Sequence, residues 1–141
     1  MSIPLKPLGR EDIRKLESAL LVMSLYSAET FEALKNVHER LTWIDSLYVA
    51  SASLARDKAG IPISKISEEI GVTEATIRRH LKGETKAGEM VLKAYERLSK
   101  EGFKINLPEI MQVQSDEVEK IKQKLSRIKE SLQNILKELE S

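Results

Sequence analysis

One ten-residue stretch, TEATIRRHLK at 73–82, is rich in side chains that can contact DNA bases and phosphates. Arginine can form two parallel hydrogen bonds to guanine, and threonine or alanine can contact the methyl group of thymine. Lysine and a further arginine can neutralise phosphates, and glutamate can accept a hydrogen bond from the amino group of cytosine. The candidate DNA-contacting residues of this stretch are Thr73, Glu74, Ala75, Thr76, Arg78, Arg79 and Lys82.

The spacing of these residues indicates a helix with two different sides. At about 100° per residue, the inner side is predicted to hold Ile77, Leu81, His80 and Thr73. The outer side, about 100° to 200° away from Ile77, holds Ala75, Arg78, Arg79 and Lys82, with Thr76 and Glu74 beside them. An ordinary solvated helix face, which is the competing interpretation, would carry mixed charge. Here the cations share one side and the single acidic residue lies at its edge.

Two short helices joined by a tight turn are predicted to position this stretch. The first covers 61–71 and the second covers 72–83, with Thr73 as its N-cap. Gly71 permits the turn because glycine adopts backbone angles that other residues resist. Ser67 supplies the small side chain that the crossing of the two helices requires. Since the first helix of such a unit crosses the DNA backbone, Ser64 and Lys65 near its start are candidate phosphate contacts.

The segment GIPISKISEEIGVTEATIRRHLKGE resembles the DNA-binding domain of helix-turn-helix repressors of the lambda- and lac-repressor kind. The continuation KAGEMVLKAYERLSKEGF is similar to the helix that follows in that group, so the resemblance covers roughly 45–103. It implies a prokaryotic transcriptional regulator, and the Lys- and Ile-rich, cysteine-free composition suggests an archaeal one. The base-reading positions of that group map onto residues 73–76, 78 and 79. Ser67 stands where alanine is usual, and no ligand-binding domain of the lac-repressor type follows, which puts small-molecule control of that kind in doubt.

The rest of the chain is predicted to be helical, which makes the fold class all-α. Residues 1–10 are interpreted as an arm, 11–44 as N-terminal helices, 45–105 as the helix-turn-helix DNA-binding domain, and 109–141 as a coiled-coil helix. Ser27 is expected to cap the second N-terminal helix. Three- and four-residue spacing predicts that this helix continues with one apolar face through Leu34, Val37, Leu41, Ile44 and Tyr48.

The tail carries an uninterrupted heptad pattern, which predicts a homo-oligomer. Its apolar seam consists of Val118, Ile121, Leu125, Ile128, Leu132, Ile135 and Leu139. We expect a homodimer, with higher order as an alternative. Across a parallel dimer Glu117 would attract Lys122, whereas Lys124 would repel Lys129, so the order and direction of the coil stay open. The tail could instead pack on the N-terminal helices, and those helices could be scaffold, dimer face or effector pocket.

Charge and composition exclude several other classes of function. The net charge is +1, but residues 56–104 hold eleven Lys and Arg against eight Asp and Glu, a local lean toward polyanions. There is no cysteine, and His38 and His80 lie far apart, so we expect no metal site and no cofactor. No catalytic constellation indicates an enzyme. The chain has no apolar run long enough to cross a bilayer, so we expect a cytoplasmic protein without a membrane partner.

These observations predict a non-enzymatic, sequence-specific regulator of transcription that binds double-stranded DNA as a homo-oligomer, with a recognition helix at 73–82. The competing hypothesis is a non-enzymatic adaptor or assembly protein whose heptad helix binds a protein partner. The operator, the regulated genes, the sign of regulation and any small-molecule effector stay open.

Overall fold

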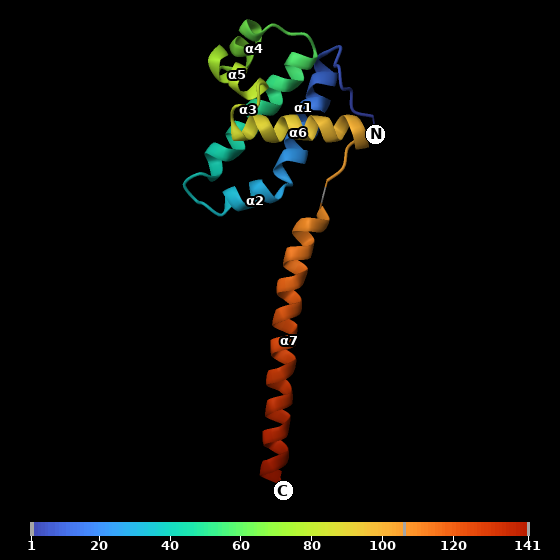
Figure 1. The fold of residues 1–141 in the computed structure, drawn as a ribbon, viewed down its shortest axis with the longest axis vertical. Coiled ribbons are helices and arrows are strands. Elements are labelled where there is room, and N and C mark those ends of the chain that lie inside the picture. The colour runs from blue at the N-terminus through green and yellow to red at the C-terminus, as the bar shows by residue number, and fades with distance from the viewer. Residues whose placement is uncertain (1, 106, 141) are drawn as a thin grey trace. The chain divides into compact units, whose positions relative to one another are not determined.

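The computed structural model describes residues 2–105 and 107–140, with the side chains of 2–105 and 116–140. Every regular element in these ranges is an α-helix, which confirms the all-α fold class (Figure 1). The helices are α1 (Arg10–Leu25), α2 (Ala28–Leu34), α3 (Arg40–Lys58), α4 (Ile63–Ile70), α5 (Glu74–Leu81), α6 (Lys86–Glu101) and α7 (Leu107–Glu140). The chain divides into two compact units, Met1–Asn106 and Leu107–Ser141.

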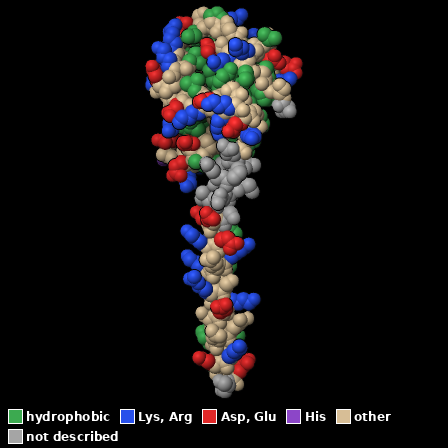
Figure 2. Space-filling model, turned by 45° about the vertical axis from the view of Figure 1, so that its right-hand side comes forward, with side chains coloured by type: hydrophobic (Ala, Val, Ile, Leu, Met, Phe, Trp, Pro, Cys, Tyr) green, Lys and Arg blue, Asp and Glu red, His purple; other side chains and the backbone are tan. Residues whose placement is uncertain are grey.

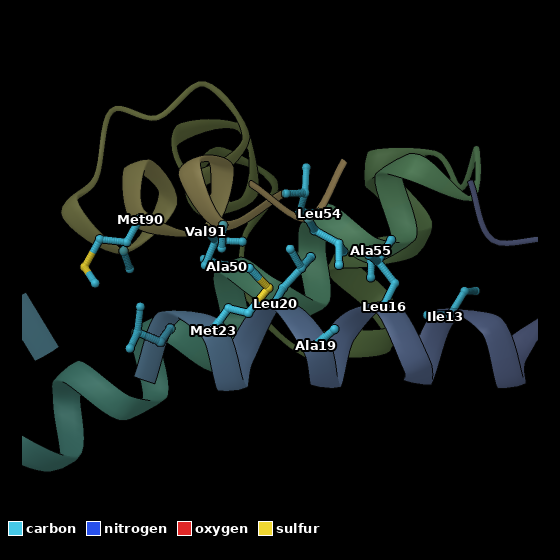
Figure 3. Packing of buried hydrophobic residues seen from close by; sticks show 14 residues of the cluster. Ile13, Leu16, Ala19, Leu20, Met23, Ala50, Leu54, Ala55, Met90 and Val91 are labelled. Carbon is cyan, nitrogen blue, oxygen red and sulfur yellow. The ribbon is translucent and has the colours of Figure 1, made fainter. Parts of the chain in front are cut away.

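Helices α1, α3 and α6 build the core of the first unit. Their apolar side chains converge in the space between the three helices, as Figure 3 shows. Leu16, Leu20 and Leu47 have no exposed surface, and Ile13, Met23, Met90, Ala94 and Leu98 are also buried. The second half of α3 is buried on every side, which its small residues in VASASLA, 49–55, make possible.

The helix predicted to continue beyond α2 is interrupted by a loop at 35–39, so that prediction was wrong. Local hydrogen bonds compete with the helix there, because Asn36 Oδ1 accepts from the backbone of His38 at 3.1 Å. The Nε of Arg40 also donates to the carbonyl of Leu34 at 2.9 Å, which satisfies the end of α2. Val37 therefore lies in the loop and is 71% exposed. Residues 44 and 45, between which a domain boundary was predicted, both lie inside α3.

The start of α2 is fixed by hydroxyl groups. Ser27 is the N-cap, as predicted, and its Oγ accepts from the backbone of Thr30 at 3.2 Å. The buried Thr30 hydroxyl donates to the carbonyl of Ser24 at 2.8 Å and accepts from Trp43 Nε1 at 3.1 Å. These bonds join the end of α1, the start of α2 and the first half of α3.

The N-terminal residues interpreted as an arm lie against the core. Pro7 is buried, and Ile3 and Leu5 pack on the apolar cluster. The Tyr95 hydroxyl donates to the carbonyl of Leu5 at 2.8 Å, which attaches the segment to α6. The ammonium group of Lys58 lies 4.7 Å from the centre of the Tyr95 ring, a cation–π contact.

Helix α7 runs without interruption over the tail that carries the heptads. Within its own unit the seam side chains are exposed, from 49% at Val118 to 77% at Leu139. Figure 2 shows Lys and Arg interspersed with Asp and Glu along the described part of this helix.

Candidate nucleic-acid interface

The turn between α4 and α5 has the backbone geometry that the sequence predicts. Gly71 has a φ of 82°, in the left-handed region that favours glycine, and its N–H donates to the carbonyl of Ser67 at 2.9 Å. The Ser67 hydroxyl donates to the carbonyl of Val72 at 2.5 Å, so a small polar residue closes the turn. Ile66 and Ile77 have no exposed surface and anchor the two helices.

Thr73 caps α5, as predicted, but it does not lie on the inner side of the helix. Its hydroxyl accepts from the backbone of Thr76 at 3.2 Å and lies 2.8 Å from the Thr76 hydroxyl. The residue is exposed and has an extended backbone, with φ −67° and ψ 152°. A cap residue lies outside the helical turn, so the angular spacing used for the helix interior does not apply to it.

The remaining predicted residues of α5 and its C-cap face solvent. Thr76 is half-buried, and the exposed residues are Glu74, Ala75, Arg78, Arg79 and Lys82. Ser64 and Lys65 are exposed in the first turn of α4, at the opposite end of that helix from Gly71. The structure thus gathers seven of the nine predicted residues at α5 and places the other two at the start of its partner helix.

The charges on α5 are weakly paired. Arg78 Nη2 lies 4.0 Å from Glu74 Oε1, one helical turn earlier, and both side chains are about half exposed. A solvated pair of this kind contributes little free energy, so Arg78 can leave Glu74 at small cost. Among the side chains that the structure describes, no ion pair within 4.0 Å involves Arg79 or Lys82. These two cations are therefore available to an external anion.

His80 joins the end of α5 to the start of α6. It lies on the predicted inner side, is 7% exposed, and its Nδ1 is 2.6 Å from the hydroxyl of Thr85. Thr85 caps α6, since its hydroxyl accepts from the backbone of Gly88 at 2.9 Å. Burial, and secondarily the positive charge of Arg79, lowers the pKa of His80 below its ordinary value of 6.5. The imidazole is therefore neutral near pH 7.

Gly88 permits this close approach, a role that the sequence prediction missed. A Cβ at this position would collide with the backbone carbonyl oxygen of His80 and would lie 2.8 Å from its Cα. The helix α6 can thus approach α5 closely only because residue 88 has no side chain. An isolated glycine inside a helical pattern is the signal that could have indicated it.

A network of partly exposed charges connects α4 to the core. Arg56 of α3 contacts Glu69 of α4 at 3.1 Å and Glu17 of α1 at 3.3 Å, and it donates to the carbonyl of Ala52 at 3.0 Å. Arg10 contacts the same Glu69 at 3.3 Å. The hydrogen bond from Arg56, reinforced by Arg10, lowers the pKa of Glu69. Because these partners are far apart in the sequence, no local pattern could have predicted the network.

Neither a metal site nor a membrane span is found in the described part of the chain. No group of three or more of its His, Asp and Glu residues is arranged to hold a metal ion. None of the helices in residues 2–105 and 107–140 is both long and apolar enough to cross a membrane.

A relative is found in the archaeon Methanocaldococcus jannaschii, where it bears the name uncharacterized protein MJ1053. The two chains are 44% identical over an alignment of 124 positions, which covers 84% of this chain and 75% of the relative. No protein-family model and no solved structure matches the chain.

Proposed function

The chain belongs to the same family as the M. jannaschii protein MJ1053, and we propose that it is a sequence-specific regulator of transcription that binds double-stranded DNA. The observation that carries this proposal is the solvent face of α5, where Arg79 and Lys82 lie beside a loosely held Arg78. This face follows a left-handed glycine turn and an exposed cap, in a segment whose sequence resembles helix-turn-helix repressors of the lambda and lac kind. The function is not enzymatic.

In the proposed complex α5 lies in the major groove and α4 crosses the DNA backbone. Arg78 and Arg79 bind guanine edges, Ala75 and Thr76 contact thymine methyl groups, and Glu74 accepts from cytosine or rejects other bases. Lys82, together with Ser64 and Lys65 at the start of α4, binds phosphates. Thr73 holds the first turn of α5 in place through its cap.

The regulator acts as a homo-oligomer, most simply a homodimer. The exposed seam of α7 supports this part of the proposal, because a parallel or antiparallel coiled coil would remove seven aliphatic side chains from water. Two copies of α5 related by a two-fold axis would address half-sites about 34 Å apart, or a multiple of that distance.

A second candidate function rests on the same exposed seam. An adaptor or assembly protein would use α7 to bind the helix of another protein, and its α4–α5 pair would be structural. This candidate predicts no appreciable affinity for DNA.

Binding to random-sequence duplex at two salt concentrations separates the two functions. If each of two protomers neutralises two to four phosphates, the binding constant falls on the order of 10²- to 10⁴-fold between about 50 and 200 mM salt. Gel shifts would measure this dependence. The absence of binding at low salt would contradict the DNA-binding proposal and favour the adaptor.

A further inference from the structure

The first half of α3 exposes an apolar stripe that its own unit covers only in part. The stripe consists of Leu41, Ile44 and Tyr48, which are 80%, 37% and 44% exposed. The second half of the same helix is buried. A side chain as large and as exposed as Leu41 at the start of such a stripe indicates a surface that another molecule covers.

The spacing of the α3 stripe is that of a coiled-coil seam. Leu41, Ile44 and Tyr48 are separated by three and four residues, which makes them successive a, d and a positions of a heptad. Arg40 then occupies the g position before the stripe, and Asp45 occupies the e position within it. These are the positions whose charges select the partner and its orientation.

The two flanking charges complement each other between identical helices that run in the same direction. In a parallel pair, a g residue faces the e residue five positions later on the other helix, so Arg40 of one copy faces Asp45 of the second copy. The two-fold axis repeats the contact, which gives two ion pairs of opposite charge. A second copy of this chain therefore fits the stripe by both apolar spacing and charge.

Both charges are available for this contact. The Nε of Arg40 donates to the carbonyl of Leu34 at 2.9 Å, which holds the guanidinium group against the end of α2. Among the described residues, no carboxylate lies within 4.0 Å of the Arg40 guanidinium group. No Lys or Arg nitrogen lies within 4.0 Å of the Asp45 carboxylate.

The position of the stripe leaves the proposed DNA-binding face free. Figure 1 shows that the first half of α3 lies at the end of its unit away from α4 and α5. From Ile44 the helix rises about 21 Å to its end at Lys58. Parallel pairing would place both α4–α5 pairs at the same end of the dimer, whereas antiparallel pairing would place them at opposite ends. This argument rests on the proposed function, but the fit of spacing and charge does not.

We propose that the α3 stripe is a homodimer interface, in which the first halves of α3 from two copies pair in parallel with two Arg40–Asp45 ion pairs. This interface does not include the seam of α7. The α3 stripe would therefore hold two copies together whether or not the α7 helices also pair.

Disulfide cross-linking of the full chain tests the proposal, because the natural sequence has no cysteine. In a parallel pair the two copies of residue 41 face each other, so Leu41→Cys is expected to form a disulfide-linked dimer at least tenfold faster than Thr42→Cys. Thr42 is exposed about 100° further around the same helix and is the matched control. Equal rates for the two variants would overturn the proposal even if α7 holds the chains together.

Charge exchange in the Leu41→Cys background tests the orientation. Arg40→Asp or Asp45→Arg alone places like charges opposite each other and is expected to slow cross-linking on the order of tenfold. The double exchange Arg40→Asp with Asp45→Arg restores opposite charges and is expected to restore the rate. Failure of the double exchange to recover the rate would overturn the parallel arrangement. DNA is absent from both assays, so their outcome is independent of whether the protein binds DNA.

Discussion

At the scale of single residues, the solvent face of α5 combines a hydrogen-bonded first turn with arginine side chains that are only weakly held. The Thr73 hydroxyl fixes the first turn by accepting from the backbone of Thr76, whereas Arg78 is held by Glu74 only at 4.0 Å. In the proposed complex, Arg78 would exchange this weak partner for a guanine edge, because a desolvated bidentate hydrogen bond is stronger than a solvated ion pair.

Gly88 provides a prediction at this scale. Gly88→Ala is expected to lower the free energy of unfolding by about 1–3 kcal/mol, because the added Cβ would press on the backbone of His80. In an unhindered helix the same change would raise it by up to about 1 kcal/mol, so the sign is diagnostic. Urea unfolding monitored by circular dichroism measures the difference.

The matched control is Gly9→Ala, whose Cβ would meet no atom within 4 Å. Gly9 is the N-cap of α1, and the loss of that preference costs on the order of 1 kcal/mol or less. If Gly88→Ala proved as stable as the unaltered protein or more so, the close contact between α5 and α6 would be wrong.

At the scale of elements, the sequence predicted what local chemistry determines. The start of α2 and the turn before α5 follow from Ser27, Gly71 and Thr73, whose effects act within one helical turn. The break between α2 and α3 was missed because residues 35–39 contain neither glycine nor proline. The side-chain bond of Asn36 to the backbone of His38 sets that loop, and it has no strong signature in a single sequence.

The contacts that hold the candidate site on its scaffold could not be predicted in the same way. Arg56 meets Glu69 and Glu17 only after α1, α3 and α4 have packed together. Many Arg and Glu residues in the chain could have formed such a network, and spacing does not select among them. The sequence thus predicted which side chains of α5 face solvent, whereas it did not predict the ion pairs that attach α4 to α1 and α3.

His80 links the stability of the α5–α6 junction to pH. Because burial lowers the pKa of His80, the unfolded chain takes up a proton on this side chain near pH 6.5, whereas the folded chain takes it up only at a lower pH. The contribution of neutral His80 to the free energy of unfolding is therefore fully present above about pH 6.5 and is lost as the pH falls below that value. We expect the free energy of unfolding to decrease between about pH 7 and pH 5, and denaturant titrations at several pH values would measure it.

Two histidine variants identify the source of this dependence. His80→Gln should remove it, and His38→Gln, in the exposed loop after α2, should retain it. A decrease that persisted unchanged in His80→Gln would assign the effect to other groups. The carboxyl groups of Glu69, Glu89 and Glu96 titrate further into acid, since ion pairing lowers the pKa of each.

At the scale of the whole molecule, the proposal for α7 requires that its seam be covered in the oligomer. Leu125→Glu with Leu132→Glu should lower the mass observed by sedimentation and reduce the helical circular dichroism of the tail. A carboxylate in the seam would have to be desolvated when two helices pair, and an unpaired helix is only marginally stable in water.

The control for this pair places the same charges on the solvent side of the helix. Gln123→Glu with Gln133→Glu lies off the seam and should leave the oligomer intact. If the seam variant kept the full oligomeric mass, α7 would not be the contact that holds the copies together. The α3 stripe would then be the remaining self-association surface in this account.

Selection of bound duplexes from a random pool would show whether α5 reads a DNA sequence. We expect enrichment of one inverted repeat with half-site centres about 34 Å apart, or a multiple of that distance. Arg78→Ala with Arg79→Ala should lose that site, whereas Lys93→Ala with Lys100→Ala, which removes the same charge from α6, should retain it. If the unaltered protein enriched no sequence, or the α5 variant enriched the same site, sequence reading by α5 would be contradicted.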